Sequence, residues 1–434
     1  MIYTVKLVTL TLVALVIPIR AADVQETTAR ERELLDRIQR LEARLAALEA
    51  RQPPLVASPV PPAAESLQPQ ANATGDSRTL PGFASGTTLN FLLDGYYEYN
   101  FNRPADHINQ LRAFDPTSNS FTLNQSVLML ERAPDVAAGR RYGMRLDLMF
   151  GQTTEALSGS PANELRTAPY RNIMQAYGTY VFPLGKGLTV DFGRFTSPIG
   201  FEGTYTKDQV NYSRSFLFTA LPFYHMGFRS AYKFSDKASF TWLLVNGLNQ
   251  MEDFNGFKSN YFMLSLSPAK SLTWNSGYYI GQESRDQPAG AISPNGRTHI
   301  GDTVLAWSAT PKLTFVGEGD YIVNRQFPGS APTHLTGGAG YVKYQLAPKF
   351  SLAGRFEYVS DRGGYLSGAT QALKEMTATA AWQPLEGFQL RWEFRHDYSN
   401  QAYFTTSTPG QFKKEQSTAL MGLLWWFGGK EGAW

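Results

Sequence analysis

The stretch FQLRWEFRHDY, residues 388–398, most constrains what this chain can fold into. Phe388, Leu390, Trp392 and Phe394 share one parity, and the residues between them are polar or charged. Because a β-strand sends alternate side chains to opposite faces, the stretch predicts a strand with one apolar and one charged face. The pattern recurs to the end of the chain, as is typical of the strands of outer-membrane barrels, which are about ten residues long.

Such strands must close on themselves, since an open sheet edge in a bilayer would leave main-chain N–H and C=O groups unpaired. We therefore expect an all-β transmembrane protein, an antiparallel outer-membrane β-barrel of about 16 strands. The expected strands are 87–101, 120–133, 141–151, 171–182, 188–196, 222–234, 238–248, 257–267, 271–283, 298–309, 313–325, 334–346, 350–360, 372–383, 388–399 and 415–427.

The connections between these segments alternate between long and short. Bacterial barrels have short periplasmic turns and longer external loops, so eight long and seven short connections predict that both termini are periplasmic. We expect the protein in the outer membrane of a Gram-negative bacterium, in contact with lipid and lipopolysaccharide. A content of 13% aromatic residues fits two aromatic girdles.

Composition excludes several other classes of protein. The chain has no cysteine, which excludes thiolate metal sites, cysteine nucleophiles and the acylated cysteine of a lipoprotein. Its net charge is only +3, so we expect no nucleic-acid partner. The five histidines lack the spacing of metal ligands, and we expect no metal site and no cofactor.

Three segments precede the expected barrel of residues 87–434. Residues 1–22 resemble a signal peptide, with Lys6, an apolar run and a small-residue end. Residues 26–52 predict a periplasmic coiled-coil helix, and residues 53–86 are a linker rich in Pro, Ala and Ser. The heptad seam, which predicts oligomerisation, consists of Leu34, Ile38, Leu41, Leu45 and Leu48. A solvated helix on a tether is the alternative, and contact with the cell wall is a further one.

The longest connection, 197–221, is the third of the eight long ones, and connections of this length are usually functional. We expect it to fold into the barrel and narrow it, with opposed acidic and basic groups that favour polar solutes. The expected constriction residues are Arg194, Glu202, Lys207, Asp208, Tyr212, Arg214, His225 and Arg229. A change of Arg214 should alter conductance or selectivity; a variant that fails to fold would make it a structural residue.

Alternation also assigns charged residues to the inner face of the wall. The expected lumen-wall residues are Arg145, Asp147, Arg355, Glu357, Arg391, Glu393, Arg395 and Asp397. Their signs are mixed, so cross-strand ion pairs that fill the wall are the first interpretation, and a role in selecting solutes is the second.

Four motifs carry a resemblance to a known family: GRFTSPIGFE, NYSRSFLF, PFYHMGFR and VNGLNQMEDFNG. The chain resembles the β-barrel porin 2 (OmpL-like) family of outer-membrane porins, although Leu248 stands where the family often has Trp. The matching positions are Arg194, Pro198, Ile199, Gly200, Asn211, Tyr212, Ser213, Arg214, Ser215, Pro222, Phe223, His225, Gly227, Val245, Asn246 and Gly247. The added heptad helix is similar to that of phosphate-selective-type porins.

The resemblance implies a porin, and together with the pattern it predicts a water-filled channel for passive diffusion of ions and small polar solutes, with weak selectivity. Because general porins are trimers, we expect a homotrimer. One alternative is a structural barrel that its third loop plugs and that is tethered to the cell wall or a partner. Ser213, His225 and Asp208 also allow an outer-membrane hydrolase, but we expect no catalytic residues.

Overall fold

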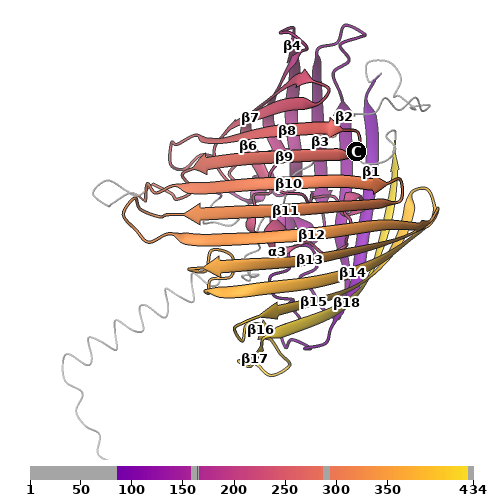
Figure 1. Cartoon of the computed structure of the whole chain (residues 1–434), viewed down its shortest axis with the longest axis vertical. Helices are drawn as coiled ribbons and strands as arrows, with labels where there is room; N and C mark the ends of the chain where they lie inside the picture. The colour runs from indigo at the N-terminus through magenta and orange to yellow at the C-terminus, as the bar shows by residue number, and fades with distance from the viewer. Residues whose placement is uncertain (1–85, 158–163, 165, 287–293, 429–434) are drawn as a thin grey trace, which may run out of the picture. The chain divides into compact units, whose positions relative to one another are not determined.

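The computed structural model describes residues 86–157, 164, 166–286 and 294–428. Sixteen strands of this part form one closed antiparallel barrel (Figure 1). Each strand pairs with the next barrel strand along the chain, and β1 closes the ring against β18. The expected fold class is therefore confirmed. The signal peptide, the heptad helix and nearly all of the linker lie outside the described residues.

The bounds of the strands follow the alternation closely. The largest difference between an expected and an observed strand end is at β7, which was expected to end at 248 and ends at 245. The barrel strands are β1 (Thr88–Asn100), β2 (Phe121–Arg132), β3 (Tyr142–Phe150), β4 (Ile173–Phe182), β5 (Leu188–Thr196), β6 (Tyr224–Ser235), β7 (Ala238–Val245), β8 (Ser259–Ala269), β9 (Leu272–Gly281), β10 (Thr298–Thr310), β11 (Leu313–Asn324), β12 (Thr333–Ala347), β13 (Phe350–Arg362), β14 (Gln371–Leu385), β15 (Phe388–Ser399) and β18 (Glu415–Gly428).

The short elements lie in the long connections. They are α2 (Thr153–Leu157), η2 (Ala168–Tyr170), η3 (Thr206–Asp208), α3 (Phe216–Ala220), β16 (Phe404–Thr405) and β17 (Phe412–Lys413). Strands β16 and β17 pair only with each other, which leaves β15 and β18 as neighbours in the barrel. In the described part of the chain, no helix is both long enough and apolar enough to cross a membrane.

The two faces of the wall differ as the alternation predicts. On β15, Arg391, Glu393 and Arg395 are buried, whereas Trp392 and Phe394 are 43% and 49% exposed. Buried charged groups on one parity and exposed rings on the other fit a barrel that is polar inside and apolar outside.

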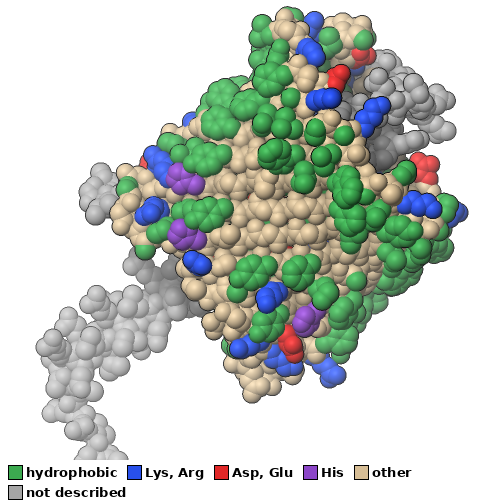
Figure 2. Space-filling view, in the orientation of Figure 1, with side chains coloured by type: hydrophobic (Ala, Val, Ile, Leu, Met, Phe, Trp, Pro, Cys, Tyr) green, Lys and Arg blue, Asp and Glu red, His purple; other side chains and the backbone are tan. Residues whose placement is uncertain are grey.

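Aromatic rings on the outer face gather toward both ends of the strands. Trp307 stacks on Phe315 near the turn between β10 and β11, and Tyr321 packs against His334 near the other end. Figure 2 shows hydrophobic side chains toward both ends of β9 to β12, with few between them. This arrangement is typical of the two aromatic girdles of a membrane barrel.

Two glycines of the motifs allow a close approach of neighbouring strands. Gly193 on β5 lies directly opposite Gly227 on β6, and their φ values are +138° and +153°. Residues with a side chain rarely adopt such values. A Cβ at Gly193 would lie 2.2 Å from the carbonyl oxygen of Ala176, and a Cβ at Gly227 would lie 2.3 Å from that of Leu244. The main chain of the flanking strands therefore requires glycine at both positions.

We predict that Gly193→Ala and Gly227→Ala will each lower the free energy of unfolding by roughly 2 kcal/mol or more, through backbone strain and a clash with paired main chain. Gly317→Ala and Gly340→Ala are matched controls. These glycines also lie opposite each other, on β11 and β12, and a Cβ there would meet no atom within 4 Å. The effect is measured by gel electrophoresis of unheated samples, as the fraction of the protein that migrates as the folded barrel. Equal folded fractions for both pairs of variants would contradict the prediction.

Candidate functional site

The third long connection, 197–223, which we call the third loop, lies against the inner wall of the barrel. All its residues from 211 to 223 are buried. Helix α3 lies against β12 and β13, and Figure 1 shows it behind these strands. Ser215 caps α3, because its side chain accepts the main-chain N–H of Phe218 at 2.9 Å. The second serine of the Tyr-Ser-Arg-Ser motif therefore starts this helix.

Two glutamates of the wall hold the main chain of the third loop. Glu393 on β15 accepts the N–H groups of Tyr212 and Ser213 at 2.6 and 2.8 Å. Glu357 on β13 accepts the first two N–H groups of α3 at 2.7 and 2.6 Å. Each glutamate thus satisfies two main-chain donors that would otherwise be buried without an acceptor.

Arginines of the same wall bind the carbonyl groups of the loop. Arg355 donates to the main-chain oxygen of Ser213 at 2.8 Å and pairs with Glu202 at 2.7 Å. Arg391 and Arg395, on β15, each donate to a further carbonyl oxygen of the loop. Wall residues of both signs therefore satisfy both kinds of main-chain group.

The third loop also reaches across the barrel. The main-chain N–H of Phe201 donates to Glu318 on β11 at 2.8 Å. The Tyr205 hydroxyl bonds Asp147 on β3. Strands β3 and β11 lie eight positions apart in either direction around the ring. The loop therefore spans the interior from one side of the wall to the other.

Arg214 lies within the loop. Its guanidinium group donates to the carbonyl oxygens of Gly203, Tyr212 and Thr204 at 3.0, 2.7 and 3.2 Å, and it lies 4.5 Å from the ring centre of Phe114. Arg214 is 1% exposed, and burial lowers its pKa to about 10, so the group stays protonated at neutral pH. This placement favours a structural role for Arg214 over direct contact with ions.

Two other expected constriction residues form a pair at the edge of the loop. Lys207 lies 2.9 Å from Asp208, and the side chain of Asp208 is 21% exposed. Burial raises the pKa of Asp208, and the Lys207 ammonium opposes that effect. Tyr212 is instead fully buried, and its hydroxyl donates to Asp94 on β1 at 2.7 Å.

Arg194 and Arg229 belong to the barrel wall beside the loop. The Arg194 guanidinium donates to the carbonyl oxygen of Tyr170 at 3.0 Å and lies 3.6 Å from the ring centre of Tyr224. Arg229 pairs with Asp191 on β5 at 2.7 Å. The structure therefore places these two arginines with partners outside the third loop.

The serine, histidine and aspartate that suggested a hydrolase have separate partners. The ring of His225 contacts Ser197 through Nε2 at 3.0 Å and a main-chain carbonyl oxygen through Nδ1. The Ser213 hydroxyl accepts a hydrogen bond from Arg355 at 3.2 Å, and Asp208 pairs with lysine. These contacts give no support to a shared catalytic group.

The expected lumen-wall residues are all buried: Arg145, Asp147, Arg355, Glu357, Arg391, Glu393, Arg395 and Asp397. Cross-strand ion pairs occur among them. Glu375 on β14 lies 2.6 Å from Arg355 and 3.3 Å from Arg395, and so links three strands. The wall charges thus both pair with one another and hold the third loop.

The first long connection, 101–120, also contributes residues to this site, and no motif of the sequence pointed to it. The side chain of Arg112 is fully buried, lies 2.9 Å from Asp397 and also pairs with Asp115. The ring of Phe114 packs edge-on against Phe218 of α3 at 5.3 Å. The sequence feature that could have predicted this contact is the presence of Arg112 and Phe114 close together in a long connection.

We predict that Glu393→Ala will lower the free energy of unfolding by roughly 3 kcal/mol, because two buried N–H groups lose their acceptor. Urea unfolding in detergent micelles, followed by tryptophan fluorescence, measures the change. Glu415→Ala is the control, since Glu415 is exposed at the start of β18. An equal midpoint and slope for both variants would show that the loop is held by other contacts.

Known structures of similar fold are outer-membrane proteins, among them one described as a channel and one described as a porin. Channel DcaP of Acinetobacter baumannii aligns with TM-score 0.52 and 11% identity over 80% of this chain and 100% of that one. The anion-selective porin from Comamonas acidovorans aligns with TM-score 0.51 and 11% identity over 79% and 99%. OmpT of Vibrio cholerae, in its trimer form, aligns with TM-score 0.51 and 9% identity over 79% and 99%. Identities this low establish the fold alone.

The family comparison covers most of the chain. Residues 86–427 match the family described as "Putative beta-barrel porin-2, OmpL-like". No curated protein matches the sequence. The family match spans the closed barrel and the third loop, in agreement with the motifs found in the sequence. The chain therefore belongs to the OmpL-like β-barrel porin-2 family of the outer membrane.

Proposed function

We propose that the protein is a porin through which ions and small polar solutes diffuse passively, and that its third loop narrows the channel. Family membership supports the channel. The observation that supports a narrowing by the third loop is that this loop spans the barrel between Glu318 on β11 and Asp147 on β3. A charged constriction of this kind admits polar solutes and rejects apolar ones.

We propose that Lys207 and Asp208 face the path of the solute. The Asp208 side chain remains 21% exposed, whereas Glu202, Tyr212 and Arg214 are almost fully buried. The Lys207 side chain is only 7% exposed and pairs with Asp208, so the net field of the two opposite charges is small. We therefore expect weak selectivity between anions and cations.

The proposed assembly is a homotrimer with both chain termini on the periplasmic side of the membrane. A similar structure is described as a trimer form, and five of the connections are two-residue turns, as periplasmic turns usually are. The residues proposed to strengthen the trimer or to contact the cell wall, Leu34 to Leu48, lie outside the described residues.

A structural barrel closed by its third loop is the second candidate, and one observation favours it. Phe216 and Leu217 of α3 are fully buried and pack with inward-facing residues such as Tyr261 and Leu335. Apolar packing of the loop on this side of the wall reduces the space left for water. Conductance separates the two candidates directly.

We predict discrete open steps in a planar bilayer in KCl from the refolded protein, with a small reversal potential across a salt gradient. Steps in multiples of three would support the trimer. Glu393→Ala should give larger or noisier steps, because it releases the loop from β15, and Glu415→Ala should match the wild type. A silent bilayer from correctly folded protein would reject the porin and favour the closed barrel.

A further inference from the structure

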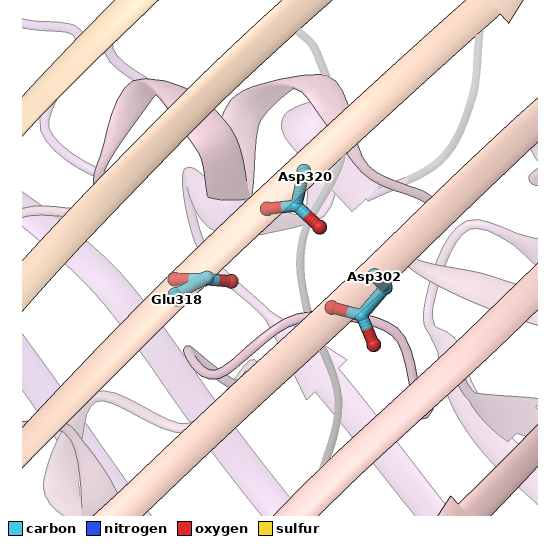
Figure 3. Close-up of side chains that lie close together, drawn as sticks. All are labelled: Asp302, Glu318 and Asp320. Carbon is cyan, nitrogen blue, oxygen red and sulfur yellow. The ribbon is translucent and has the colours of Figure 1, made fainter.

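Three carboxylates of the inner wall lie together beside the start of the third loop (Figure 3). They are Asp302 on β10 and Glu318 and Asp320 on β11, and one oxygen of each lies within 4.8 Å of the others. Asp302 and Asp320 are direct cross-strand partners, and all three residues are buried. Three negative charges this close repel one another strongly unless something neutralises them.

Two of these carboxylates receive hydrogen bonds that leave room for a ligand. Asp302 accepts the main-chain N–H of Gly200 at 3.1 Å and the Tyr261 hydroxyl at 3.2 Å, one on each oxygen. Glu318 likewise accepts one N–H of the loop at 2.8 Å and one tyrosine hydroxyl at 2.9 Å. A carboxylate oxygen can accept two hydrogen bonds. Each of these four oxygens accepts one, so each has one acceptor position left for a further ligand.

Asp320 is the carboxylate of the three that lacks hydrogen-bond donors. It is 4% exposed, and neither of its oxygens accepts a hydrogen bond from an N–H group or a hydroxyl group; its polar neighbours are the carboxyl groups of Asp302 and Glu318. Within the described ranges, no ion pair of 4.0 Å or less joins Asp302, Glu318 or Asp320 to a basic side chain. Figure 3 shows an oxygen of each residue turned toward the space between them. Such a group requires either shared protons or a cation.

We propose that Asp302, Glu318 and Asp320 bind Ca²⁺, which fastens the start of the third loop to β10 and β11. Ca²⁺ takes oxygen ligands at about 2.3–2.6 Å, so oxygens on opposite sides of the ion lie about 5 Å apart, which agrees with the spacing of the cluster. Mg²⁺ requires near-ideal octahedral geometry and keeps its waters, which a buried site on a rigid sheet suits less well. A divalent ion also neutralises more charge than one shared proton.

The Pro-Ile-Gly motif positions the loop for this site. Ile199 is fully buried among residues of the barrel wall, which anchors the turn. Gly200 has a φ of +88° and donates its N–H to Asp302. A residue with a side chain would be strained there, so glycine allows the main chain to approach the carboxylates.

Tb³⁺ is a suitable probe, because it replaces Ca²⁺ and its emission rises when a tyrosine lies nearby. The hydroxyls of Tyr261 and Tyr341 both contact the cluster. The full-length protein is refolded without lipopolysaccharide, which itself binds Ca²⁺. We expect tyrosine-sensitised emission that saturates at one ion per chain and that Ca²⁺ displaces at lower concentration than Mg²⁺. We also expect a higher unfolding temperature in Ca²⁺ than in EDTA.

Asp320→Asn tests the site itself, because it replaces a carboxylate that accepts no hydrogen bond from an N–H group or a hydroxyl group. We expect Tb³⁺ binding at least about tenfold weaker, loss of the Ca²⁺ effect on unfolding temperature, and stability in EDTA equal to or above that of the wild type. Glu386→Gln, which removes an exposed charge from a short turn, should change none of these. The readouts do not depend on ion conduction.

Two results would overturn the proposal. One is undiminished Tb³⁺ binding in Asp320→Asn, which would place the ion elsewhere. The other is a wild-type unfolding temperature that is equal in Ca²⁺ and EDTA, which would show that the cluster holds protons instead. If Asp320→Asn fails to fold, Asp302→Asn and the wild-type comparison still decide the question.

Discussion

The structure depends on the hydrogen bonding of buried wall charges to the main chain of the third loop. A loop without regular structure carries many N–H and C=O groups that cannot remain unpaired when they are buried. Glu357 and Glu393 accept the N–H groups in consecutive pairs, and Arg355, Arg391 and Arg395 bind the carbonyl oxygens. The same bonds stabilise wall charges that would otherwise be costly to bury. Loop and wall therefore require each other.

The family motifs acquire a physical meaning from these contacts. Gly193 and Gly227 allow strands to approach, and Gly200 turns the loop toward Asp302. Asn249, in the fourth long connection, accepts the main-chain N–H groups of Phe223 and Tyr224 at 2.6 and 3.2 Å and so fixes the exit of the third loop. These motif residues thus serve the placement of the loop, which is the feature that would distinguish an open channel from a closed barrel.

Local sequence was sufficient to predict the barrel because strand alternation is a nearest-neighbour property. The alternation within each strand predicts its apolar and its polar face without reference to any other strand, and the sixteen strands form one closed sheet. The inner position of Arg355 and Glu393 follows from parity alone. Their partners do not, since they lie at sequence separations of 142 and 181 residues. Parity also gives no sign that Arg214 turns toward its own loop.

The sequence by itself determined that the chain forms a barrel, which side chains face inward and which connection is long enough to enter the interior. Only the tertiary structure decided where that connection lies, that Arg112 of the first connection pairs with Asp397, and that Asp302, Glu318 and Asp320 meet. The reason is geometric. The face of a side chain and the length of a connection follow from local sequence. A site inside a barrel depends on the register between strands and on loops that cross from one side of the ring to the other.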